Sequence, residues 1–120
     1  MDDYLERLAA TREQYPFARW AESEMDQYTE EACASFAAVF DELIRKLGAL
    51  GERASEEKKI EAFREAVEAL NTLNEDDPSL IETGEREELC ELCNIVAKAA
   101  GIDPTKYGDG EGPASEWRDW

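Results

Sequence analysis

Three cysteines are the residues of this 120-residue chain with the most obvious capacity for chemistry: Cys90 and Cys93, in a Cys-x-x-Cys spacing, and Cys33. A redox pair of this spacing has its first thiol at a helix N-terminus, where the helix dipole lowers the thiol pKa. A structural zinc site needs four ligands, usually in two close pairs. The chain has no histidine, and Cys33 lies far from the pair. A thiol or metal site built on all three cysteines is therefore kept only as an alternative function.

The position of the pair favours ordinary packing instead. Residues 83–100 have a helical pattern in which Cys93 lies on the apolar face with Leu89 and Val96, whereas Cys90 lies on its flank. Free cysteine is among the residue types most often buried. We expect Cys93 to be in the core, Cys90 to be half exposed, and the neighbouring glutamates to raise both thiol pKa values.

Other catalytic chemistry is poorly supported. Without histidine, the chain cannot form a serine or cysteine triad with a histidine base, a zinc-hydrolase motif or a Glu-x-x-His di-iron site. Paired carboxylates remain available among thirty acidic residues, but no pattern marks one as desolvated in a cleft. The sequence predicts a protein that is not an enzyme and has no cofactor.

The charge is strongly negative and uneven. Residues 1–60 contain fourteen acidic and eight basic side chains, a net charge of −6, whereas residues 61–120 contain sixteen and five, a net charge of −11. Such a surface repels nucleic acids and anionic membranes and speeds encounter with a basic protein. No run is apolar enough to span a bilayer, and the first residues are acidic rather than a basic leader, so a cytoplasmic location is expected.

Helical periodicity dominates the first 102 residues and predicts an all-α, single-domain bundle of four main helices. The first expected helix covers residues 3–14. The second begins near Ser23 or Thr29 and ends at Gly48, the third is capped by Ser55, and the fourth is capped by Thr83 and ends at Gly101. One domain of 120 residues is expected, without repeats or linkers.

The tail, residues 103–120, contains three glycines, two prolines and two tryptophans. Ser115 is expected to cap a short closing turn, and we expect the tail to pack on the bundle because tryptophan is rarely left fully exposed. The acidic second half and the tail aromatics predict a surface for a basic protein partner. Its candidate residues are Glu85, Glu87, Glu88, Glu91, Asp109, Glu111 and Trp117.

Two segments carry a resemblance to a known group of proteins: SLIETGEREELCELC, residues 79–93, and GDGEGPASEWRDW, residues 108–120. They resemble small uncharacterised bacterial proteins that carry a domain of unknown function, over residues 55–120. In size and charge the chain is similar to immunity proteins, which inhibit bacterial toxins by covering a basic active site. The resemblance implies no catalytic residues. A purely structural or oligomeric role is a further alternative, and the oligomeric state stays open.

Overall fold

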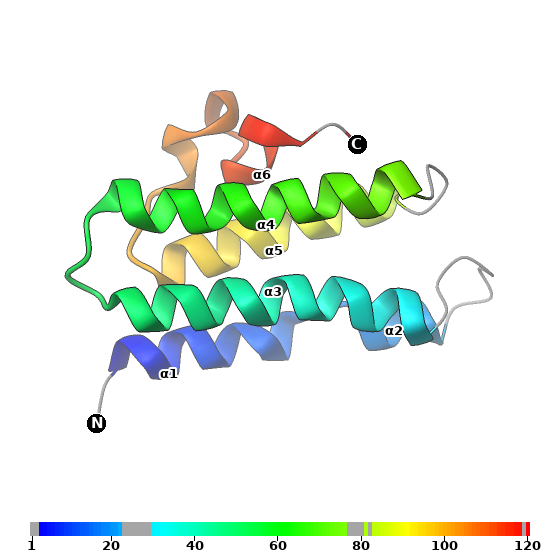
Figure 1. Ribbon diagram of the computed structural model, residues 1–120, viewed down its shortest axis with the longest axis horizontal. Coiled ribbons are helices and arrows are strands. Elements are labelled where there is room, and N and C mark those ends of the chain that lie inside the picture. Colours follow the sequence, from blue (N-terminus) through cyan, green and yellow to red (C-terminus); the bar gives the residue numbers. More distant parts are fainter. Residues whose placement is uncertain (1–2, 23–29, 77–80, 82, 119) are drawn as a thin grey trace.

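The computed structural model describes residues 3–22, 30–76, 81, 83–118 and 120. Its elements, in chain order, are α1 (Asp3–Ala10), η1 (Thr11–Gln14), α2 (Phe17–Ala21), α3 (Glu30–Leu50), α4 (Glu56–Asp76), α5 (Thr83–Ala99), η2 (Pro104–Lys106), η3 (Gly108–Gly110) and α6 (Pro113–Trp117), where η marks a 3₁₀ helix. In Figure 1, α3 and α4 lie side by side, α5 lies behind α4, and the tail lies against α4 and α5. The described residues form the predicted all-α bundle of four main helices with an attached tail.

The core is formed by the apolar faces that the helical periodicity predicts. Phe36, Phe40 and Leu47 of α3 are fully buried, as are Phe63, Val67 and Leu70 of α4. At one end of the bundle, aromatic rings from α2 and α3 pack on one another, with the Phe17 and Phe36 rings stacked at 5.9 Å. Apolar burial of this kind is the main source of stability in a small helical domain. No helix of the described residues is long and apolar enough to cross a membrane.

The helix ends match the sequence predictions in part. Ser55 Oγ accepts a hydrogen bond from Lys58 N at 3.3 Å, which confirms the N-cap of α4. Gly101, the predicted end of the fourth helix, has a φ of 83°, and Ile102 N donates to Ala97 O at 2.9 Å, which together form a Schellman motif. The two predicted starts of α3, Ser23 and Thr29, lie outside the described residues, as does the side chain of Thr83.

The prediction that α3 ends at Gly48 is wrong. The helix continues to Leu50, and Gly51 takes the left-handed conformation, with a φ of 87° and a hydrogen bond from its N–H to Leu47 O. Gly48 lies inside α3 beneath α1, where an added Cβ would be 3.1 Å from Leu5 Cδ2. Its small size permits the close approach of α1 to α3, and it does not end the helix.

The tail packs on the bundle, as the sequence predicts. Ala114 is buried, Asn71 Nδ2 of α4 donates to Trp117 O at 3.0 Å, and Asn94 Nδ2 of α5 donates to Glu111 O at 3.1 Å. The closing turn forms as α6, but Ser115 does not cap it, because the helix begins at Pro113 after Gly112. A proline at the first helical position needs no hydrogen-bond partner for its nitrogen, so it favours this start.

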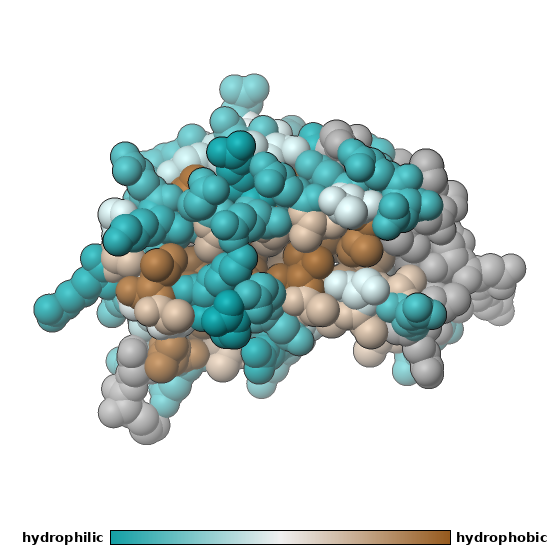
Figure 2. Space-filling model, viewed as in Figure 1, coloured by the Kyte–Doolittle hydropathy of each residue, from teal (hydrophilic) through white to brown (hydrophobic). Residues whose placement is uncertain are grey.

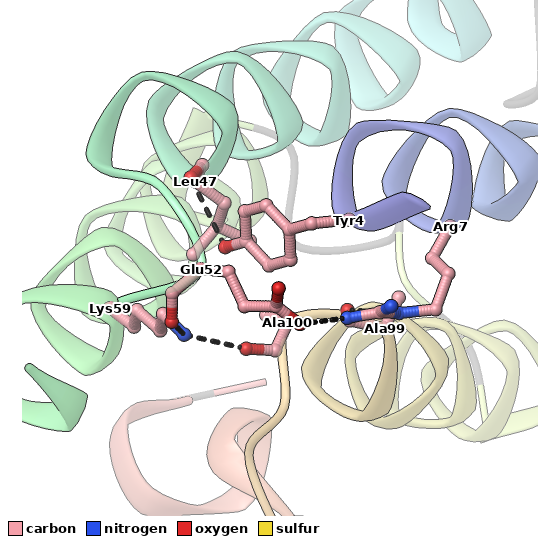
Figure 3. Close-up of polar contacts among 7 residues, drawn as sticks. All are labelled: Tyr4, Arg7, Leu47, Glu52, Lys59, Ala99 and Ala100. Carbon is pink, nitrogen blue, oxygen red and sulfur yellow. Dashed lines mark hydrogen bonds and ion pairs between the residues drawn. The ribbon is translucent and has the colours of Figure 1, made fainter. Parts of the chain in front are cut away.

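The C-terminal ends of α3 and α5 lie together at the end of the bundle opposite the aromatic rings of α2 and α3. The last backbone carbonyls of a helix lack partners within that helix. The buried Lys59 Nζ donates to Ala100 O at 2.9 Å and to Glu52 O at 2.7 Å. Tyr4 Oη donates to Leu47 O, and Arg7 Nε donates to Ala99 O, so α1 is joined to both helix ends (Figure 3). Cations at helix C-termini are favoured by the helix dipole.

Candidate functional site

The predicted partner-binding residues fall into two groups that the structure separates. Glu87 and Glu91, one turn apart on α5, line one cleft together with Glu111 of the tail. This cleft, about 390 Å³ in volume, lies between α5 and the tail and also contains Cys90 and Asn94. We call it the α5–tail cleft. It exists because Asn94 holds the tail backbone at Glu111, so the two segments lie close together.

A second hollow of about 400 Å³ adjoins the α5–tail cleft and shares Glu111, Ser115 and Arg118 with it. Asp109, another predicted residue, lines this hollow and has a left-handed φ of 55° between two glycines. Glu116 also lines it, although the sequence analysis did not select that residue. Together the two hollows contain five carboxylates and two guanidinium groups, a net charge of −3.

Glu88 does not belong to this cleft. Its Oε2 accepts hydrogen bonds from Trp20 Nε1 at 2.7 Å and from Arg19 Nη2 at 3.0 Å, so the carboxylate holds α2 against α5. Glu88 and Glu91 line a separate pocket of about 150 Å³ with Arg19. A carboxylate that already accepts from an arginine and a buried indole has little capacity left for a partner.

Two further predicted residues also lie apart from the cleft. Glu85 is partly buried on α5 and lines none of the hollows described here. Trp117 is partly buried and packs on the core, with its carbonyl bonded to Asn71. We therefore interpret Glu88 and Trp117 as structural, place Glu85 outside the cleft, and take the remaining four predicted residues as the candidate site.

The two arginines of the cleft are positioned by local contacts. Arg118 Nη1 donates to Trp120 O at 2.7 Å, its Nε donates to Ser115 Oγ at 3.4 Å, and its guanidinium lies 5.6 Å from the centre of the Trp120 ring. Arg86 lines the cleft one turn before Cys90, and its Nε is buried without a hydrogen-bond partner. The sequence did not identify Arg86 and Arg118 as cleft residues. An arginine beside several acidic residues usually forms an ion pair on the surface, and the sequence does not show which face of the molecule each arginine occupies.

Cys90 and Cys93 are placed as predicted. Cys93 and Cys33 are buried and Cys90 is half-buried in the α5–tail cleft. Burial raises the pKa of all three thiols, so each is a weak nucleophile at neutral pH. Desolvation is the largest cause for both thiols of the pair, and for Cys90 the charge of Glu111 adds to the raised pKa whereas Arg118 and Arg86 lower it.

A metal site receives no support from the geometry. Within the described ranges, no three cysteine, aspartate or glutamate side chains gather closely enough to hold a metal ion. Cys33 on α3 is thus not grouped with the α5 pair in such a cluster, which the three-cysteine alternative requires.

In comparisons with known proteins, no family model, no curated protein and no solved structure matches this chain. The α5–tail cleft offers carboxylates on two walls and hydrogen-bonding groups from Asn94 and Ser115, and its three carboxylates outnumber its two arginines. These groups are suited to binding a cation, such as a lysine or arginine side chain.

Proposed function

We propose that this protein is a non-enzymatic binding domain whose α5–tail cleft receives a basic side chain of a partner protein. The observation that carries the proposal is the convergence of Glu87 and Glu91 from α5 with Glu111 from the tail around one cleft. A guanidinium or ammonium group in this cleft would meet carboxylates on both walls. Such complementary charges speed association and select the partner.

The adjoining hollow extends the same interaction. Asp109 and Glu116 lie next to the cleft, so a second basic residue of the partner would meet a second pair of carboxylates. A partner with two or more neighbouring lysines or arginines on its surface therefore fits best. The specific form of this proposal is an immunity-type protein that covers the basic active site of a toxin in a bacterial cytoplasm. Its carboxylates would contact basic residues of the toxin in the same way.

The experiment compares the wild type with a triple variant, Glu87→Gln/Glu91→Gln/Glu111→Gln, using an oligoarginine peptide as the probe. Glutamine keeps the shape and removes three charges from the cleft. Each exposed ion pair contributes up to about 1 kcal/mol, so we expect affinity to fall by about tenfold or more. Calorimetry at low and high ionic strength should show weaker wild-type binding at high salt.

A matched control removes three charges elsewhere. Glu6, Glu13 and Glu57 are exposed, and Glu6→Gln/Glu13→Gln/Glu57→Gln changes the net charge by the same amount. We expect this control to keep most of the affinity. If both triple variants bind equally weakly, the overall field binds the peptide and the cleft has no special role.

The thiol of Cys90 gives an independent readout of position. Because Cys90 lines the cleft and is half-buried, its slow alkylation should slow further when the peptide occupies the cleft. Mass spectrometry of proteolytic fragments of the protein measures the alkylation rate of each cysteine. Binding that leaves the rate at Cys90 unchanged would place the peptide elsewhere and contradict the proposal.

A further inference from the structure

A second surface feature lies along the seam between α3 and α4, and its lining residues differ in kind from those of the α5–tail cleft. Two hollows of about 410 and 100 Å³ share Lys46, Ala62 and Glu65 and together form what we call the α3–α4 groove. Figure 2 shows apolar side chains along this seam, flanked by hydrophilic ones. The apolar residues that line the groove are Val39, Leu43, Ala49, Leu50, Ala62, Ala66 and Ala69.

The groove is electrically neutral in a protein of net charge −17. Its charged residues are three basic side chains, Arg45, Lys46 and Lys58, and three acidic ones, Glu42, Glu61 and Glu65. Two pairs are already formed, because Arg45 bonds to Glu42 and Lys46 forms an ion pair with Glu65 across the groove. A second copy of the chain meets no net repulsion on this face, whereas the net charge of two copies opposes contact through their acidic faces.

The two hollows lie on either side of the Lys46–Glu65 pair. Leu50, one of the two exposed large apolar residues in the described part of the chain, lines the larger hollow. Val39 and Ala69 line the far side of the smaller hollow. Leu50 and Val39 are separated by about 16 Å along α3, and the Lys46–Glu65 pair lies between them. A two-fold axis through this pair would place the projecting Leu50 of each copy at the smaller hollow of the other.

We propose that the α3–α4 groove is the interface of a symmetric homodimer. The groove occupies about 16 Å of a longer face, because α3 and α4 have 21 residues each and are about 31 Å long. With a width of about 20 Å for two packed helices, the face covers roughly 600 Å² per copy. Specific interfaces bury about 800 Å² per partner, so this dimer is weak and depends on protein concentration.

The sign of the salt effect follows from the charges. Two copies of net charge −17 repel each other at long range, and the neutral groove contributes little to that repulsion. Added salt screens the repulsion, so it should strengthen the dimer by several-fold. Salt has the opposite effect on an acidic cleft that binds a basic partner.

The test is sedimentation equilibrium of the full chain over a wide concentration range, at low and high salt. Leu50→Gln removes the projecting apolar side chain from both copies at once, and we expect it to raise the dissociation constant by about tenfold or more. Leu5→Gln is the matched control, because Leu5 is the other exposed leucine, lies outside the groove and is 47% exposed against 37% for Leu50. The control should dimerise like the wild type.

A disulfide experiment tests the two-fold arrangement. In Leu50→Cys/Ala69→Cys, the new cysteine at position 50 of each copy should form a disulfide with that at position 69 of the other, giving a covalent dimer under mild oxidation. Leu5→Cys/Ala69→Cys should give far less. A wild type that stays monomeric at about 1 mM, a dimer that tolerates Leu50→Gln, or a dimer that salt weakens would each overturn the proposal.

Discussion

The α5–tail cleft and the α3–α4 groove are built in different ways, and this difference determines what each can bind. The cleft and the hollow that adjoins it together have five carboxylates against two arginines, and the cleft takes one wall from an irregular tail. The groove has no net charge, combines apolar residues with equal numbers of acidic and basic ones, and is formed by the two longest helices of the described residues. Charge recognition uses polar groups from loops, whereas self-association uses the regular face of a helix pair.

The two regions also differ in how firmly they are held. The helices of the groove are fixed by fully buried residues such as Phe40, Leu43 and Phe63. The tail wall of the cleft is held by the burial of Ala114, by the packing of Trp117 on the core, and by the polar contacts of Asn71 and Asn94 with the tail backbone. Perturbing the tail should therefore destroy the cleft and leave the groove intact, which separates the two proposals experimentally.

The largest such effect is expected from Gly112→Ala. An added Cβ at Gly112 would lie 1.8 Å from Asn94 Oδ1, and the φ of 119° is strained for any residue with a side chain. Overlap and strain together should lower the free energy of unfolding by about 3 kcal/mol. Urea unfolding measures this loss, and binding of oligoarginine should be lost while dimerisation at the groove persists.

Gly51→Ala is the matched control for Gly112→Ala. Gly51 also has a positive φ, 87°, but an added Cβ there would meet no atom within 4 Å. Only backbone strain remains, so the expected loss is about 1 kcal/mol and peptide binding is retained. Equal losses in the two variants would mean that the contact with Asn94 does not hold the tail.

A smaller effect, common to both regions, is expected from Lys59→Met. Lys59 Nζ satisfies the carbonyls of Glu52 and Ala100, and methionine would leave both without this donor. Each unsatisfied carbonyl costs about 1 kcal/mol or more, so the free energy of unfolding should fall by about 2 kcal/mol. The cleft and the groove should weaken together, because α4 and α5 are joined at this end.

The neighbouring Lys58→Met is the control for Lys59→Met, because Lys58 is exposed and makes none of the Lys59 contacts. The free energy of unfolding of Lys58→Met should differ from that of the wild type by less than about 0.5 kcal/mol. Urea unfolding of both variants measures the two free energies of unfolding that are compared. A loss at Lys58 as large as at Lys59 would show that charge alone, rather than the two carbonyl contacts, explains the effect.

The sequence predicted the features that depend on local pattern. Periodicity located the four main helices, because apolar residues at helical spacing have few other ways to be buried. Ser55 and Gly101 were found because capping and the left-handed turn have strong residue preferences. Gly48 was misassigned as a helix end, because the same small residue also permits close helix packing, and only the position of α1 distinguishes the two roles.

The candidate site was predicted less completely, because its selection depends on tertiary contacts. Glu87, Glu88 and Glu91 are alike in the sequence, yet only Glu88 is held by Trp20. That contact arises through the short helix α2, which has five residues and too short a pattern to detect. One usable signal was overlooked: Lys59 occurs four residues before Phe63 on the inward face of α4, and a charge in an apolar stripe indicates a buried contact.

The smallest effect concerns the attachment of the tail to α4. Tyr107 Oη donates to Glu56 Oε2 at 2.9 Å, and partial burial together with this hydrogen bond raises the Tyr107 pKa to about 12. Tyr107→Phe removes the bond and should lower the free energy of unfolding at neutral pH by about 0.5–1 kcal/mol. Oligoarginine binding should weaken only slightly, since other contacts still hold the tail.

The same pair has a defined pH dependence. The folded protein favours the neutral phenol, so the contribution of Tyr107 is fully present below its ordinary pKa of 10.0 and is lost as pH rises towards about 12. The stability difference between wild type and Tyr107→Phe should therefore shrink over this range. Glu56→Gln should reduce the shift, because it replaces a charged acceptor with a neutral one. Urea unfolding at several pH values measures the difference in free energy of unfolding between wild type and Tyr107→Phe. A difference that stays constant from pH 9 to about 12 would contradict the assigned hydrogen bond.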